Sequence, residues 1–136
     1  MKPIVLKPYS KANPLTVTVR RKRWLRGEGA DPSRLLRSTD LKQCCLGFAA
    51  CAIGVPRRLL LDTQALHEDT ITERCVVKGL ARRKRELEIG SQRLLHTAVA
   101  GHLMTTNDDP LLTEVIREAT IAKLGARIGL RFQFVG

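Results

Sequence analysis

Aromatic residues, long apolar runs and targeting signals are scarce in this sequence, and each scarcity excludes a class of protein. Aromatic residues make up 4% of the 136 residues, with one Trp, one Tyr and three Phe. This number is too small for a platform on which single-stranded bases stack. No apolar run reaches the roughly 20 residues that cross a bilayer. Residues 1–14 lack the apolar stretch and small-residue cleavage site of a secretory signal, so we expect a cytoplasmic protein that does not engage membranes.

Motifs for metal binding and catalysis are also missing. The four cysteines and three histidines lack C-x-x-C and H-x-x-x-H spacing, which argues against a zinc site. No G-x-S-x-G, H-E-x-x-H or P-loop pattern occurs. Gly27–Gly29 begins like a dinucleotide loop, but Pro32 stands where the third glycine should be. We therefore expect a protein that is not an enzyme and that uses no metal ion or cofactor.

Acidic residues are few, and the charge balance is strongly basic. Thirteen Asp and Glu stand against 24 Lys and Arg, which gives a net charge of +11. Much of the excess lies in two runs, residues 20–26 and residues 82–85, and such runs favour polyanions or acidic protein faces. The candidate binding residues are Arg20, Arg21, Lys22, Arg23, Arg26, Arg57, Arg58, Arg82, Arg83, Lys84 and Arg85.

The most apolar segment, Leu41–Ile53, predicts a buried helix. Asp40 is a suitable N-cap, Gln43 completes a capping box, and Gly54 suits the position after the helix. The segment has no polar face, and a helix that is apolar all round is enclosed on every side. It also carries three of the four cysteines, which we interpret as reduced core residues. This helix is therefore the predicted centre of the core.

Alternating apolar and polar residues predict half-buried strands over Leu15–Arg20 and Leu130–Phe134. Helices are expected over about 31–37, 91–105 and 112–128, whereas residues 71–89 fit either a strand around Val76 and Val77 or a helix. In the last helix the expected apolar stripe consists of Leu112, Val115, Ile116, Ala119, Leu124 and Ile128. The predicted class is α+β, with a small antiparallel sheet from the terminal strands packed on a buried central helix and two further helices. Prolines make residues 1–14 an extended N-terminal arm, and residues 15–136 form one domain.

Four segments together resemble a group of small uncharacterised proteins encoded by tailed bacteriophages and prophages. The segments are VTVRRKRWLRGEG, LLRSTDLKQCCLGFAACAIG, LMTTNDDP and TEVIREATIAKLGARIGLRFQFV. The shared pattern is a Trp, a Gly-x-Gly turn, Cys-Cys-Leu-Gly, an Asn-Asp turn and a closing helix and strand. The resemblance covers most of residues 17–135 and implies a phage setting and a common fold. Small proteins in that setting often look like anti-defence factors, including inhibitors of CRISPR effector complexes.

These observations predict a non-catalytic phage accessory protein that binds and blocks a nucleic-acid-handling host or defence complex, as an anti-CRISPR-like inhibitor, through its basic surface. Direct, non-specific binding of nucleic acid by the same residues is an alternative, and so is a virion or assembly component. A small hydrolase or metal enzyme would require His67, His96, His102 and Asp108 to converge. Trp24, which lies inside the first basic run, is expected to pack in the core rather than to anchor an interface.

Overall fold

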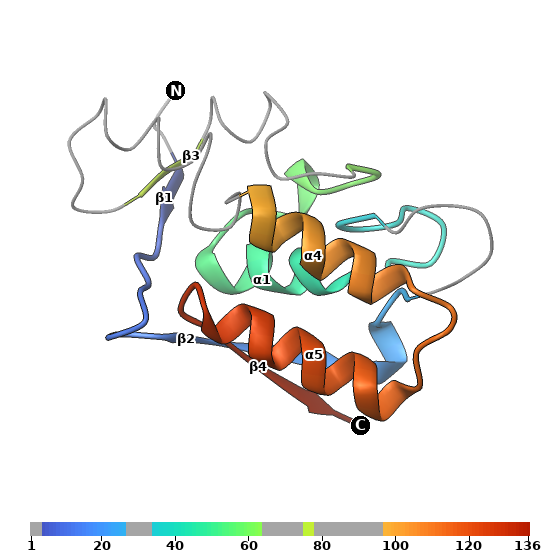
Figure 1. Cartoon of the computed structure of the whole chain (residues 1–136). Coiled ribbons are helices and arrows are strands. Elements are labelled where there is room, and N and C mark those ends of the chain that lie inside the picture. Colours follow the sequence, from blue (N-terminus) through green and yellow to red (C-terminus); the bar gives the residue numbers. More distant parts are fainter. Residues whose placement is uncertain (1–3, 27–33, 64–74, 78–96) are drawn as a thin grey trace.

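A computed structural model describes residues 4–26, 34–63, 75–77 and 97–136 of the chain (Figure 1). In chain order the elements are β1 (Ile4–Leu6), β2 (Leu15–Arg20), the 3-10 turn η1 (Arg21–Arg23), α1 (Cys45–Ile53), the 3-10 turn η2 (Arg57–Leu59), β3 (Cys75–Val77), α4 (Thr97–Asp108), α5 (Glu114–Ala126) and β4 (Leu130–Val135). The chain thus combines helices with short strands, as the α+β class requires.

The strands of the described residues form two separate pairs, and both pairs are parallel. β1 pairs with β3, and β2 pairs with β4 so that Leu15 lies opposite Leu130 and Arg20 opposite Val135. The predicted antiparallel sheet is therefore wrong. The chain leaves β2, passes through the helices, and begins β4 beside the start of β2, where the Leu15 amide donates to the Gly129 carbonyl at 2.9 Å. Parallel pairing requires a long crossover of this kind.

The predicted positions and faces of the two terminal strands are confirmed. Val17 and Val19 of β2 are fully buried, as is Leu130 of β4. The opposite face of this sheet is polar and exposed, and there Gln133 Nε2 donates to Thr18 Oγ1 at 2.7 Å. The outer residues of the two strands are Thr16, Thr18, Arg20, Arg131, Gln133 and Val135, and this face includes no acidic residue.

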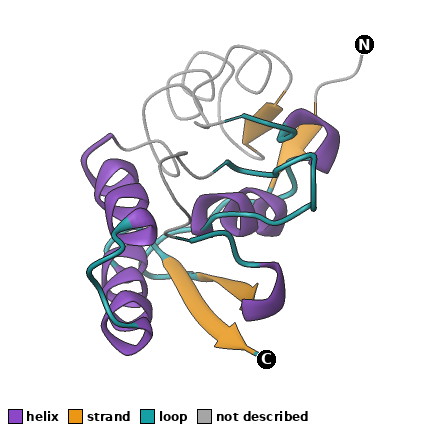
Figure 2. Cartoon of the chain, turned by 90° about the vertical axis from the view of Figure 1, so that its right-hand side faces the viewer, coloured by secondary structure: helices purple, strands orange, loops and turns teal. Residues whose placement is uncertain are grey.

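The helices cover only one side of the β2–β4 sheet. α5 packs against β4, α1 packs against β2, and α4 lies against both α5 and α1. Figure 2 shows α4 and α5 side by side, with α1 beside them and the two strands below. The core lies between these helices and the inner face of the sheet, so that the outer face is left open.

α1 is a core helix, as predicted, but it begins later than expected. Gly54 follows it with a φ of 107°, a left-handed conformation that glycine adopts without strain, so its predicted place is confirmed. The prediction of Asp40 as N-cap is wrong, because the N-cap is Cys44. Gln43 instead pairs in an extended conformation with the segment that contains Trp24. This pairing keeps residues 41–44 out of the helix.

α5 lies where a helix was predicted, and Leu124 of the predicted stripe is buried, but the buried face near the start of the helix is different. Val115 and Ile116 were expected to be buried, yet they are 79% and 52% exposed. Ile121 is fully buried and Arg117 is only 6% exposed. The helix is therefore rotated so that a charged side chain points inward near its start, for a reason that the candidate site explains.

Other sequence predictions have mixed outcomes. α4 covers part of the helix predicted over 91–105 and ends at Asp108, while residues 91–96 lie outside the described residues. No helix occurs over residues 34–37, where Leu36 instead forms a bridge with Leu61. β3 supplies the strand alternative around Val76, and residues 81–89 are not described.

Residues of the predicted N-terminal arm contact the core. Leu6 and Tyr9 are buried, and the Lys7 amide donates to the Ile53 carbonyl at 2.8 Å. The division of the chain at residue 15 stays a prediction. In the described part of the chain, no helix combines the length and the apolar character needed to cross a membrane.

Candidate functional site

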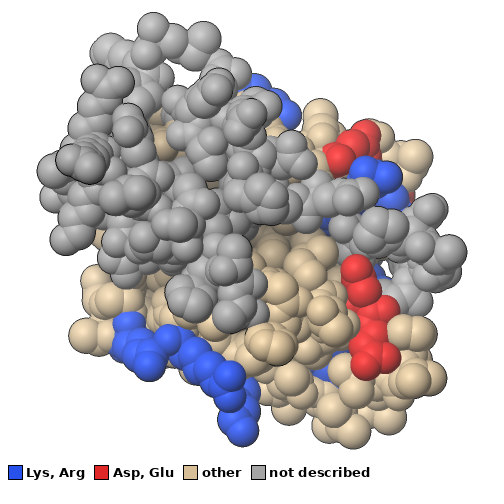
Figure 3. Space-filling view, turned by 45° about the horizontal axis from the view of Figure 1, so that its top comes forward, with Lys and Arg blue, Asp and Glu red and all other residues tan. Residues whose placement is uncertain are grey.

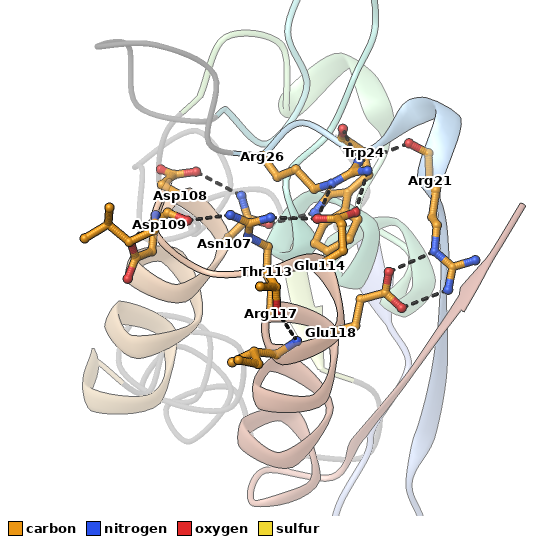
Figure 4. Close-up of polar contacts among 12 residues, drawn as sticks. Arg21, Trp24, Arg26, Asn107, Asp108, Asp109, Thr113, Glu114, Arg117 and Glu118 are labelled. Carbon is orange, nitrogen blue, oxygen red and sulfur yellow. Dashed lines mark hydrogen bonds and ion pairs between the residues drawn. The ribbon is translucent and has the colours of Figure 1, made fainter.

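The basic run at residues 20–26 divides into cations held by acidic residues and cations that face solvent. Arg21 donates from Nε and Nη2 to the two carboxylate oxygens of Glu118, each at 2.8 Å. Arg26 binds Glu114 in the same two-pronged way, at 2.9 Å from Nε and 2.6 Å from Nη2. Figure 4 shows these pairs at the start of α5. Two of the predicted binding residues therefore fix the turn to a helix.

Trp24 lies between these two arginines and anchors the turn in the core. Its side chain is 1% exposed, and its indole Nε1 donates to Asn107 Oδ1 at 2.8 Å. The same oxygen accepts the backbone amide of Cys45 at 3.0 Å, and Asn107 Nδ2 donates to the Leu25 carbonyl at 2.9 Å. The prediction that Trp24 packs in the core is confirmed, and Asn107 joins the turn to both α1 and α4.

Backbone pairing holds the turn from its other side. The Gln43 amide donates to the Arg23 carbonyl at 2.9 Å, and the Leu25 amide donates to the Gln43 carbonyl at 2.7 Å. Arg26 Nη1 also donates to the carbonyls of Arg21 and Trp24 at 3.2 and 3.1 Å. A turn with this many partners presents its remaining side chains from a fixed backbone, and such preorganisation lowers the entropy lost on binding.

The inner side of the turn has a shared carboxylate. Glu114 accepts from Arg26 and also from Arg117 Nη1, at 2.6 Å. Burial raises the pKa of Glu114, but the hydrogen bonds from Arg26 and Arg117 outweigh burial, so that the pKa lies below its usual value. The guanidinium of Arg26 also lies over the Trp24 ring, 4.3 Å from its centroid. These contacts explain why α5 turns Arg117 inward.

The outward side of the turn carries cations without acidic partners. Arg20, Lys22 and Arg23 are exposed and form no ion pair within the described part of the chain. Arg131 adds a fourth exposed cation on the outer face of the sheet. We call Arg20, Lys22, Arg23 and Arg131 the basic face. Figure 3 views another side of the molecule: a strip of Lys and Arg lies at its lower left, away from η1 and the basic face, and acidic side chains lie beside basic ones at its right.

The other predicted binding residues do not extend this surface in the described structure. Arg57 and Arg58 are exposed in η2. Figures 1 and 2 both place η2 above α1 and η1 below it, so these two arginines lie apart from the basic face. The run from Arg82 to Arg85 lies outside the described residues.

Sequence reasoning missed the residues that organise the site. Asn107 was interpreted as part of a turn, although it lies at the end of α4 as a buried side chain. Glu114 and Glu118 stand one helical turn apart, and their partners Arg21 and Arg26 are five residues apart. This spacing of two acids on a helix was the available signal, but it does not say which of the 24 basic residues are their partners.

The cysteines have the character of core residues. Cys44, Cys45 and Cys75 are buried, and Cys51 is half-buried. Burial raises the pKa of Cys44 to about 12 and raises the pKa of Cys45 as well, so both are protonated thiols at neutral pH. Among the described residues, no group of three or more His, Cys, Asp or Glu is placed to hold a metal ion. His67 and His96 lie outside those residues.

The basic turn and the side chains that anchor it are therefore the candidate functional site. Comparison of the chain with protein-family models, with curated proteins and with solved structures gave no match.

Proposed function

We propose that this protein acts by binding rather than by catalysis, as a phage-encoded accessory protein in the host cytoplasm. It engages a host or defence complex that handles nucleic acid and blocks it, in the manner of an anti-CRISPR inhibitor. The basic face makes the contact. The phage setting of the proposal comes from the resemblance of the sequence segments, and the contact surface comes from the arrangement of η1 and the sheet.

The observation that carries the proposal is the separation of roles within one short run. Arg21 and Arg26 are bound to carboxylates of α5, while Lys22 and Arg23 point to solvent from the same turn. A turn that served only solubility would not need two bidentate ion pairs, a buried Trp and a buried Asn to fix it. Rigid presentation of cations suits an anionic partner whose charges have a regular spacing.

Charge complementarity indicates which part of such a complex is contacted. A groove that holds nucleic acid is itself positively charged, and it repels a protein with a net charge of +11. The phosphate backbone of the nucleic acid in the complex attracts the same protein. We therefore propose that the basic face contacts phosphates of nucleic acid that the complex has already bound.

The contact is directed at the backbone rather than at the bases. All five aromatic residues of the chain are described, and each is buried or half-buried. The Trp24 ring is also covered by Arg26. No aromatic side chain is therefore exposed for stacking with a base, and phosphate contacts alone carry no sequence information.

A co-purification experiment tests the proposal. The tagged protein and the variant Arg20→Glu/Arg23→Glu are recovered from host-cell lysate, with and without nuclease treatment. We expect the wild-type protein to retain a nucleic-acid-containing complex that the variant and the nuclease both release. Equal recovery by the variant contradicts the proposal. Recovery that resists nuclease but requires the two arginines contradicts the phosphate contact, because it indicates an acidic protein surface.

The matched control is Arg57→Glu/Arg58→Glu, which makes the same change in net charge on η2. We expect this control to behave as the wild-type protein does. If it loses the complex to the same extent, the effect belongs to total charge and the proposed basic face is wrong.

A further inference from the structure

A pocket lies between η1 and the start of α5, beside the basic face, and Lys22 of that face is part of its lining. Its volume is about 560 Å³, and its charged lining consists of Arg21, Lys22, Arg26, Lys42, Arg117 and Glu114. A volume of this order is typical of a small-ligand site. The lining also includes Pro110 and Leu112. Five cationic side chains and one carboxylate thus meet in one concave region.

Among the described residues, the guanidinium groups that line this pocket outnumber the carboxylates that bind them. Glu114 is shared between Arg26 and Arg117, and Glu118 is taken by Arg21. Three guanidinium groups therefore meet two carboxylates, before the ammonium group of Lys22 is counted. A further anion bound among these cations would therefore gain favourable charge–charge interactions with them.

Arg117 supplies an independent sign of an unfilled site. Its side chain is 7% exposed, and it donates from Nη1 to Glu114 and from Nη2 to the Asp109 carbonyl. Its Nε is buried and has no hydrogen-bond partner in the described structure. Buried polar atoms of this kind are nearly always paired in native proteins. Arg117, which lines the pocket, thus has a buried donor for which the described structure shows no acceptor.

Donors for a ligand remain on the accessible side of the pocket. Arg21 uses Nε and Nη2 for Glu118, which leaves its Nη1 group. Lys22 is exposed and forms no ion pair within the described residues. An Nη1 group of an arginine beside a lysine ammonium supplies charged N–H donors, which suit the oxygens of a phosphate group.

We infer that this pocket binds a single phosphate group, and we call it the phosphate pocket. The inference rests on the proposed function, because it names a second contact with the same class of partner. The ligand is recognised by its charge and not by a base, since Arg26 covers the Trp24 ring at 4.3 Å and the ring is 1% exposed. Free phosphate, a terminal phosphate of a nucleic acid and a backbone phosphate share this chemistry.

Fluorescence of the single Trp tests the inference, because Trp24 lines the pocket and no other Trp contributes signal. The full chain is titrated with inorganic phosphate, and a parallel titration uses sodium chloride at the same ionic strength. We expect a saturable change with phosphate and none with chloride. The absence of a saturable change, or the same change with chloride, overturns the inference.

Two sets of variants assign the response to the pocket. Lys22→Ala/Lys42→Ala removes two lining cations at positions that are not buried, and we expect about tenfold weaker phosphate binding or more, since charge-assisted hydrogen bonds are lost. Lys123→Ala/Arg127→Ala removes the same charge near the far end of α5 and should leave binding unchanged. Equal weakening in both variants overturns the assignment to the pocket.

Three further ligands distinguish the sources of the phosphate. A nucleoside 5′-monophosphate, a 5′-phosphorylated oligonucleotide and the same oligonucleotide with a 5′-hydroxyl are titrated against the wild-type protein. Binding of only the phosphorylated species assigns a terminal phosphate, whereas equal binding of both oligonucleotides assigns the backbone. Tighter binding of a poly-glutamate peptide than of every phosphate ligand overturns the inference.

The phosphate pocket and the proposed function can fail separately. The variant Arg20→Glu/Arg23→Glu lies outside the pocket lining. If the Trp24 signal does not respond to phosphate but this variant still loses nucleic acid, the pocket is wrong and the proposed function stands. If the Trp24 signal responds to phosphate but the protein does not bind nucleic acid, the phosphate pocket stands and the proposed function is wrong.

Discussion

The amide oxygen of Asn107 accepts a hydrogen bond from the indole Nε1 of Trp24 at 2.8 Å, across 83 residues of sequence. The same oxygen accepts the amide of Cys45 at the start of α1. One buried side chain thus ties together the basic turn, the core helix and the end of α4. The orientation of the basic face depends on this contact, although Asn107 itself is fully buried.

Replacement of Asn107 should destabilise the protein and loosen the basic turn. In Asn107→Ala the indole of Trp24, the Cys45 amide and the Leu25 carbonyl lose their buried partner. Buried groups left unpaired cost about 1–3 kcal/mol each, so we expect the free energy of unfolding to fall by about 3 kcal/mol or more. Urea unfolding followed by circular dichroism measures this change.

A double-mutant cycle shows how much of that loss belongs to the hydrogen bond with Trp24. Trp24→Phe keeps an aromatic ring but removes the indole donor. We expect the two substitutions together to cost less than the sum of the single effects, because they remove the same hydrogen bond. Strict additivity would show that this hydrogen bond contributes nothing to stability.

The glycine inside α1 should tolerate no side chain. A Cβ at Gly47 would overlap the Leu35 carbonyl oxygen, so the backbone of one segment must move. We expect Gly47→Ala to lower the free energy of unfolding by about 1–3 kcal/mol or more.

Gly101→Ala is the matched control, because no atom lies within 4 Å of the added Cβ on α4. It should raise stability by about 0.5–1 kcal/mol, since alanine favours the helix. Thermal unfolding of both variants decides the matter. Similar unfolding temperatures would mean that Leu35 does not lie where the structure places it.

Protonation of Asp40, in the loop before α1, should lower the stability of the protein at acidic pH. Hydrogen bonds from Arg37, at 3.0 and 2.5 Å, lower the pKa of Asp40 from 3.8 to about 2. A carboxyl with a lowered folded-state pKa stabilises the protein above the unfolded-state pKa, and the contribution disappears as the pH falls through the folded-state pKa. We therefore expect Asp40→Asn to be less stable than the wild-type protein at about pH 6, with the difference closing between pH 3.8 and about 2. Urea midpoints across that range measure the difference, and a gap independent of pH would contradict the assignment.

The thiols of α1 and its N-cap should be inert while the protein is folded. Cys44 and Cys45 are fully buried, and burial raises the pKa of each above its usual value. Because the thiolate is the reactive form, we expect both to resist a thiol-reactive dye in buffer and to react at once in urea. Mass spectrometry of labelled peptides identifies the sites. Rapid labelling of either residue in the native protein would mean that α1 is not enclosed.

The sequence predicted the elements better than their arrangement. Alternation placed β2 from Leu15 to Arg20, because burial of Val17 and Val19 on one face is a local pattern. The same alternation is identical for parallel and antiparallel pairing, so it could not give the direction of β4. Pairing of Gln43 with the Trp24 segment is non-local, and for this reason the start of α1 was predicted too early.

The candidate site was predicted only in part, for a related reason. Clustered charge identified the basic run, but the roles of its members depend on Glu118, 97 residues from Arg21, and on Glu114, 88 residues from Arg26. The periodicity of apolar residues predicted the burial of Leu124 but the wrong buried face near the start of α5. An inward Arg117 is stable only because Glu114 and the Asp109 carbonyl accept its hydrogen bonds, and the one-dimensional pattern does not contain that information.

The salt dependence of nucleic-acid binding tests the central claim, that the basic face contacts phosphates, most directly. Fluorescence anisotropy measures the affinity of the wild-type protein and of Arg20→Glu/Arg23→Glu for one labelled duplex over a series of salt concentrations. Each phosphate contact contributes about 0.9 to the slope of log K against log salt. We expect the wild-type protein to bind with a clear negative slope, and the variant to bind more weakly with a slope smaller by about 0.9 for each phosphate that it no longer neutralises. Equal affinity and slope for the two proteins, or no binding by the wild-type protein at moderate salt, would contradict the account.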